Sequence, residues 1–124
     1  KVADLITISG DVHHIFPRSY LKNNGVDNKT KYNQVANYIY LDTQVNKAIS
    51  DDAPNVYFGK VLKQCEGGNI VLGNIADKDL LVTNLEENCI PQDIRNMTVE
   101  NYDEFLTERR KMMAVLIQKY YERL

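Results

Sequence analysis

The sequence has little of what marks several large classes of protein. It contains no tryptophan, three prolines and two cysteines. Cys65 and Cys89 lie far apart and neither belongs to a Cys-x-x-Cys pair, so a zinc ribbon is unsupported and a disulfide cannot be assumed. No apolar run approaches the roughly 20 residues that span a bilayer. We therefore expect a protein without a membrane span, in a reducing cytoplasmic compartment.

The chain also lacks a strong charge of either sign, because its formal net charge is −2. Most nucleic-acid-binding modules carry an excess of lysine and arginine, so this balance argues against nonspecific binding of a polyanion by the whole surface. The charges are nevertheless unevenly distributed. Residues 18–47 carry five basic side chains against two acidic ones, whereas acidic residues dominate 77–104. Only the first of these segments is suited to face phosphate groups.

What the chain does have is the size and composition of one domain. Its 124 residues, with 44% hydrophobic residues, are ordinary for a single globular domain. The sequence begins at Lys1 and shows no leader pattern, so we expect an excised C-terminal fragment of a longer protein. Within the single domain, 1–124, we expect a mixed N-terminal part over 7–50 and a helical part over 54–124.

The N-terminal third alternates extended runs with polar segments. The run LITISGDVHHIFP (5–17) predicts a strand, a turn at the Ser-Gly pair and a second strand that ends at two histidines. The polar segment 21–34 has no periodicity and is predicted to be a long loop. VANYIYL (35–41) predicts the partner strand, and a short helix is expected over 43–50.

The rest of the chain predicts helices. The first is expected to begin near Pro54 and to end before the pair Gly67-Gly68, and the second to cover 77–88, before Pro91. A hairpin followed by mostly helical structure is an α+β fold.

The last segment predicts a long amphipathic helix that closes the domain. It opens with a Thr98 cap, and its apolar side chains recur at helical spacing. These side chains are Phe105, Met112, Met113, Leu116, Ile117 and Tyr120. Arg109 falls within this face, where a lone charge is costly unless it is paired. It can contact a substrate phosphate, or instead bind a carboxylate or the carbonyls at a helix end.

Both histidines of the chain, His13 and His14, are adjacent in DVHHIFPRSYL (11–21). Imidazole has an unperturbed pKa that suits a general base, and its neutral form also binds metal ions. Neighbouring residues on a strand point to opposite faces, so one shared site requires a strand end, and Pro17 supplies it. The alternative is structural, with one histidine exposed and the other hydrogen-bonded in the core.

DVHHIFPRSYL, followed by NYIYLDTQVN (37–46), in which Asn37 and Asn46 are nine positions apart, resembles the HNH nucleases, also called His-Me finger or ββα-metal nucleases. The pattern is similar to the HNH domain of type II CRISPR nucleases. It is closer to the C-terminal nuclease domain of GmrSD-type modification-dependent restriction enzymes, through NKAISDDAPNVYF (46–58). The resemblance covers 7–58 and, loosely, the last helix. It implies a ββα-metal finger, which is a hairpin with a long loop followed by a short helix.

The resemblance also implies roles for individual residues. His14 corresponds to the general base that takes a proton from the attacking water, and Asn37 to the residue that holds the loop and orients this base. His13 and Asn46 correspond to ligands of one divalent metal ion, which Asp11 can support indirectly. The expected ion is Mg²⁺ or Mn²⁺, and an imidazole ligand also suits Ni²⁺ or Zn²⁺.

The function that the resemblance implies is a metal-dependent endonuclease that hydrolyses DNA phosphodiester bonds, in restriction of foreign or modified DNA. Its partners are then double-stranded DNA and an upstream recognition or NTP-binding domain of the same protein, with a homo-oligomer as a further option. Candidate phosphate contacts are Arg18, Lys22, Lys47 and Arg109. Two other classes stay open. One is a non-catalytic DNA-binding or oligomerisation module that retains the fold, and the other is an RNA-cleaving enzyme.

Overall fold

Two short strands and a set of helices make up the computed structural model, which describes residues 11–41, 49–68 and 75–124. In chain order the elements are β1 (Asp11–His14), α2 (Arg18–Asn23), α3 (Lys29–Tyr32), the 3-10 helix η1 (Val35–Asn37), β2 (Tyr38–Leu41), α5 (Pro54–Cys65), α6 (Lys78–Glu87), the 3-10 helices η2 (Gln92–Asn96) and η3 (Val99–Asn101), and α7 (Tyr102–Glu122). A hairpin therefore precedes mostly helical structure, and the α+β prediction is confirmed.

The two strands form an antiparallel sheet in which His13 lies opposite Ile39 and His14 opposite Tyr38. β2, with the sequence Tyr-Ile-Tyr-Leu, is rich in β-branched and aromatic residues, as is usual for a strand that packs one face on a core. The strand predicted to enter the histidines and its partner are thus both present. The other strand predicted before Gly10, and nearly all of the helix predicted over 43–50, lie outside the described residues.

The prediction of one long loop over 21–34 is wrong. The segment contains the end of α2 and all of α3, which Asn28 caps by accepting a hydrogen bond from Thr30 N at 2.9 Å. The buried residue of α2 is Leu21 and that of α3 is Tyr32. Helices this short bury so few side chains that no helical periodicity can develop in the sequence.

The predicted helices of the C-terminal part are confirmed, and their ends have the expected chemistry. α5 has a proline in its first turn, and Gly67 after its end adopts φ +94°, which favours glycine. Asp77 caps the N-terminus of α6, and its side chain accepts a hydrogen bond from Asp79 N at 2.7 Å. The Thr98 cap is part of a capping box with Asn101, so α7 is entered through the short helix η3.

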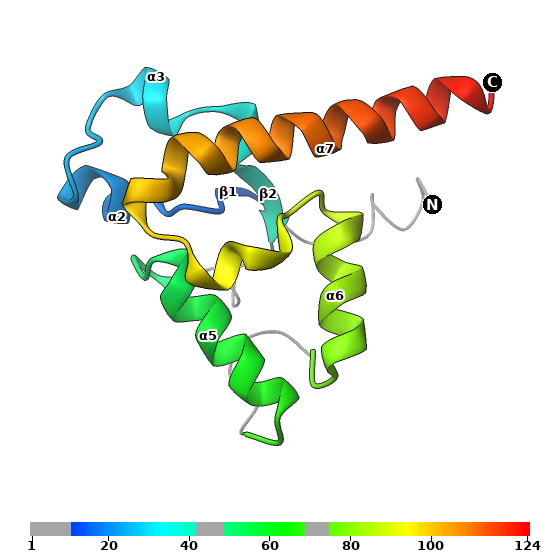
Figure 1. Cartoon of the computed structure of the whole chain (residues 1–124). Coiled ribbons are helices and arrows are strands. Elements are labelled where there is room, and N and C mark those ends of the chain that lie inside the picture. The colour runs from blue at the N-terminus through cyan, green and yellow to red at the C-terminus, as the bar shows by residue number, and fades with distance from the viewer. Residues whose placement is uncertain (1–10, 42–48, 69–74) are drawn as a thin grey trace.

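The main core forms around the two residues that follow the histidines. Ile15 and Phe16 are buried, and the Phe16 ring packs against Phe105 at 4.9 Å and Tyr102 at 5.2 Å between centroids. Figure 1 shows α7 running across the upper part of the molecule, with α5 and α6 below it in that view. The end of β1 is therefore fixed by packing against α7.

α7 closes the domain only along its first half. Phe105 and Leu106 are buried, but Leu116, Ile117 and Tyr120 are 54%, 55% and 63% exposed. In Figure 1 the C-terminal part of α7 extends past the other labelled elements. The predicted apolar face exists, but the described residues do not cover its second half. No helix in the described segments combines the length and the hydropathy that a membrane crossing needs.

Arg109 is a structural residue in this fold. Its side chain is 6% exposed, and Nη1 donates hydrogen bonds to the carbonyls of Ala36 at 3.0 Å and Tyr38 at 2.5 Å. Its Nη2 donates to the carbonyl of Asn88, just after α6, at 3.0 Å. Of the three partners considered for Arg109 from the sequence, which were a phosphate, a carboxylate and helix-end carbonyls, the structure shows the carbonyls. Arg109 is therefore withdrawn as a candidate phosphate contact, because its guanidinium is buried and already bonded.

We expect Arg109→Met to lower the free energy of unfolding by about 2–4 kcal/mol, because three carbonyls lose their charged donor while the apolar stem is kept. Urea denaturation measures this value. Lys111→Met is the matched control, since Lys111 is exposed on the same helix, and its effect should stay within about 0.5 kcal/mol. Equal effects of the two substitutions would contradict the structural role of Arg109.

Candidate active site

His14 is the last residue of β1, and its ring is held by neighbours on several sides. Its Nε2 lies 2.9 Å from Oδ1 of Asn33. The ring meets Tyr38 edge to face, with centroids 5.3 Å apart and planes at 86°, and a second edge contact joins it to Tyr32 at 6.3 Å. The imidazole therefore has a defined orientation before any substrate is bound.

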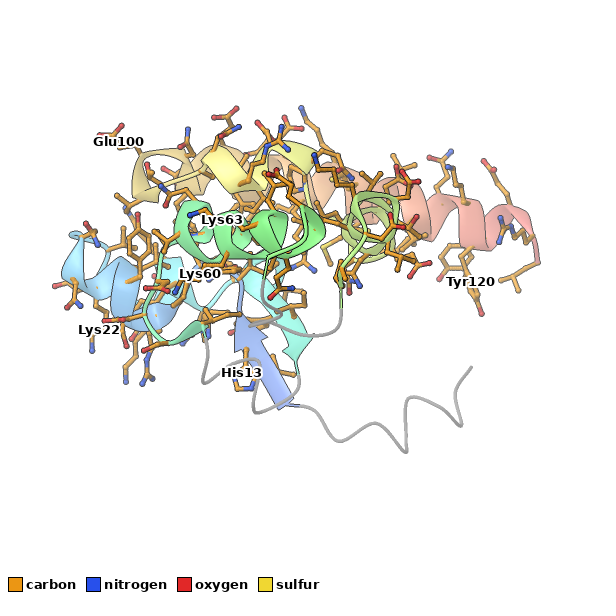
Figure 2. All side chains as sticks on the ribbon, turned by 90° about the horizontal axis from the view of Figure 1, so that it is seen from below. His13, Lys22, Lys60, Lys63, Glu100 and Tyr120 are labelled. Carbon is orange, nitrogen blue, oxygen red and sulfur yellow. The ribbon has the colours of Figure 1, made fainter. Side chains whose placement is uncertain are left out.

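His13 has different surroundings, because successive strand residues face opposite sides of the sheet. Its ring is partly buried, and the Nε2 atom is buried without a hydrogen-bond partner among the described residues. Figure 2 shows His13 on β1, at the edge of the described structure away from α7. Buried polar atoms in native proteins nearly always have a partner, and none of the described residues supplies one here. In a neutral imidazole, the ring nitrogen that carries no proton has a free lone pair and can bind a metal ion.

Asn37 links the segment that follows His14 to the end of α3. The side chain is fully buried. Its Oδ1 accepts a hydrogen bond from Phe16 N at 2.8 Å, while Nδ2 donates to Phe16 O at 3.1 Å and to Tyr32 O at 3.2 Å. Its backbone carbonyl also accepts from Ile15 N at 2.7 Å. These contacts hold the segment after β1 against the end of α3.

Tyr57 fixes the same segment from the side of α5. Its hydroxyl donates to the carbonyl of Ile15, the residue after His14. Burial raises the pKa of Tyr57 well above its usual value, so the hydroxyl remains a donor at any physiological pH. Tyr57 was not predicted as a site residue, although it is the tyrosine of the NKAISDDAPNVYF segment. Asn33 was not predicted either, since nothing distinguishes it from the other asparagines of a polar stretch.

The remaining predicted site residues divide into two groups. Arg18 and Lys22 are exposed on α2, where they can contact a substrate. Asn46, Lys47 and the side chain of Asp11 lie outside the described part of the chain. Within that part, no three His, Cys, Asp or Glu side chains come together as a metal site. The predicted metal ligands are therefore represented by His13 alone.

Comparison with protein-family models, with curated proteins and with solved structures found no match. The functional argument therefore depends on the residues themselves.

We expect Asn37→Ala to lower the free energy of unfolding by about 2–3 kcal/mol, because two carbonyls and one amide hydrogen lose a buried partner. Asn37→Asp should be no milder, since a carboxylate keeps the acceptor for Phe16 N but lacks both donors. The control is Asn24→Ala. Asn24 is exposed, and its side-chain amide donates to Tyr20 O at 2.8 Å, so the loss of this side chain should cost less than about 1 kcal/mol by urea denaturation. A stable Asn37→Asp protein would rule out the donor role.

Proposed function

We propose that this chain is a metal-dependent endonuclease domain that hydrolyses DNA phosphodiester bonds. The observation that carries the proposal is the paired environment of the two histidines at the end of β1. His14 is oriented by Asn33 and two tyrosine rings, whereas Nε2 of the adjacent His13 is buried without a partner among the described residues. The proposed general base is the imidazole with the fixed ring, and the proposed metal ligand is the imidazole whose nitrogen lacks a partner among these residues.

The hairpin, together with the chain after β2, is proposed to form a ββα-metal finger. His13 and Asn46 would hold one divalent ion there, supported by Asp11. The unpartnered Nε2 of His13 fits this role, because a metal ligand needs a neutral nitrogen with its lone pair free. Such an ion stabilises the negative charge that develops on the phosphate and the leaving oxygen.

His14 is the proposed general base. It accepts a proton from the water that attacks the phosphorus atom, and its fixed ring keeps the accepting nitrogen in one direction. Asn37 and Tyr57 support this step through the backbone, since both bind residues that directly follow His14. Rigid support of this kind matters because catalytic groups must keep their geometry within a fraction of an ångström.

The DNA is proposed to approach from the side of α2 and α3. Arg18 and Lys22 are exposed on α2, and Lys29 and Lys31 are exposed on α3. Local basic clusters bind the phosphate backbone even when the whole protein has a slight negative charge. Recognition of modified DNA would then belong to an upstream, NTP-binding part of the same protein, as in the restriction enzymes that the sequence resembles.

The test is cleavage of supercoiled plasmid in Mg²⁺ or Mn²⁺, with EDTA as the chelator control. We expect nicking or cutting with metal and none with EDTA. His14→Ala should lower the rate by about 10²–10⁴-fold while Mn²⁺ binding by calorimetry is retained, because a general base contributes that much. His13→Ala should weaken Mn²⁺ binding by more than about tenfold.

Three results would count against the proposal. Cleavage that survives EDTA excludes the metal mechanism, and equal losses of Mn²⁺ binding in both variants exclude the division of roles. Cleavage of single-stranded RNA with no cutting of DNA would assign the site to the RNA-cleaving alternative. Circular dichroism of each variant checks that the fold is intact, so that loss of activity is not loss of structure.

A second candidate function is self-association without catalysis, and α7 favours it. Met113, Ile117 and Tyr120 on α7, and Leu124 just beyond its end, follow one another at intervals of four, three and four residues, the spacing at which paired helices meet. Of these, Ile117, Tyr120 and Leu124 are 55%, 63% and 84% exposed. A second copy of the chain presents the same face, and two such faces can cover each other.

If α7 mediates this association, Ile117→Lys should shift the mass measured by light scattering after size-exclusion chromatography from dimer to monomer. Val115→Lys is the matched control, because Val115 is 51% exposed, similar to Ile117, but faces another side of the helix. A wild-type chain that stays monomeric at high micromolar concentration would exclude this candidate. The result of the light-scattering measurement does not change how the cleavage experiment is interpreted.

A further inference from the structure

The hydrogen bond between His14 and Asn33 defines which ring nitrogen of His14 carries a proton. The two atoms involved are Nε2 of His14 and Oδ1 of Asn33, 2.9 Å apart. An amide oxygen only accepts hydrogen bonds, so Nε2 must be the donor. In a neutral imidazole the other nitrogen, Nδ1, then carries the free lone pair.

The segment that presents Asn33 is fixed on both sides of this residue. Nδ2 of Asn37 donates to Tyr32 O at 3.2 Å, and the hydroxyl of Tyr102 donates to Lys31 O at 2.6 Å. On the other side, Nη2 of Arg110 donates to Oε1 of Gln34 at 2.9 Å. Asn33 itself ends α3, where its backbone N–H bonds to Lys29 O. The backbone from which the Asn33 side chain extends is thus held by α7 and by Asn37.

The surroundings of the His14 ring also oppose its rotation. The edge contacts with Tyr38 and Tyr32 occupy two sides of the imidazole, and Tyr38 is the residue opposite His14 in the sheet. A half-turn about the Cβ–Cγ bond would separate Nε2 from Asn33. The hydrogen bond to Asn33 is therefore the contact that selects one ring orientation and one proton position.

We propose that Asn33 is a positioning residue for His14, which holds the Nε2–H form of the ring and so makes Nδ1 the nitrogen that accepts the proton of the attacking water. This inference rests on the proposed nuclease function for its catalytic part. The hydrogen bond and the proton position can be measured without any activity.

The test compares Asn33→Leu, which keeps the size but removes the acceptor, with Asn33→Asp, which keeps an acceptor in the same place. Asn24→Ala is the control for loss of an exposed asparagine in this region. Nitrogen-15 NMR of the imidazole side chains is recorded at about pH 8, where an ordinary histidine is neutral. His13 in the same spectrum is the internal comparison.

In the wild-type chain we expect a slowly exchanging proton on Nε2 of His14 and none on Nδ1. This proton signal should broaden or vanish through solvent exchange in Asn33→Leu and persist in Asn33→Asp and Asn24→Ala. In the plasmid assay, kcat should fall about tenfold or more in Asn33→Leu with KM little changed, because positioning and not substrate binding is lost. Asn33→Asp should retain most of kcat.

A proton on Nδ1 of His14 in the wild-type chain, or an unchanged Nε2 proton signal in Asn33→Leu, would overturn the inference while leaving nuclease activity untouched. Full kcat in Asn33→Leu would also overturn it, in a protein that still cuts DNA. If the wild-type chain neither binds Mn²⁺ nor cuts, the proposed function fails, and the catalytic role of Asn33 fails with it. The NMR result then shows separately whether the hydrogen bond exists.

Discussion

The buried amide of Asn37 is the interaction on which the N-terminal half of the fold depends. Each strand of the hairpin has four residues, so the sheet itself offers few hydrogen bonds to hold the chain on either side of it. One amide group both accepts and donates, and in Asn37 it joins Phe16 to Tyr32. Because this side chain is fully buried, water cannot replace a missing bond. The end of β1 and the end of α3 are therefore held at a fixed separation, which sets the position of His14.

Other long polar side chains extend the same principle through the core. Tyr57, Tyr102 and Arg109 each donate to backbone carbonyls, and all three come from helices that follow the hairpin in sequence. Burial raises the pKa of Tyr102 to about 12 and that of Tyr57 further, so both hydroxyls stay protonated donors. Burial lowers the pKa of Arg109, which stays charged because an arginine starts far above neutral pH. Irregular segments thus obtain from side chains the partners that a larger sheet would supply.

The sequence predicted those features whose cause is local or periodic. α5, α6 and α7 have caps, a proline or glycines at their ends and enough turns to show a pattern, and β2 has a run of β-branched and aromatic residues. α2 and α3 were missed because each buries too few side chains to show periodicity, and their stability comes from a core that the local sequence does not reveal. In the candidate site the histidine pair stood out by rarity. Asn33 did not stand out, because its partner His14 lies 19 positions away and the two residues meet through the folding of the chain.

Under the proposed function, the adjacency of the two histidines has a physical reason. A single imidazole cannot be fixed by a hydrogen bond, accept a proton and also bind a metal ion at the same time. Two successive residues can divide these tasks, since the pleat places their rings in different surroundings. Of the two histidines, His13 has the feature that is harder to explain by packing alone, because its buried Nε2 has no hydrogen-bond partner among the described residues. Arg109 also has a buried nitrogen, Nε, without a partner among the described residues, but its other two nitrogens bind three carbonyls and account for its burial. No hydrogen bond of the His13 side chain in the described structure gives a comparable reason for its Nε2 to be buried, and under the proposed function the bound metal ion would supply one.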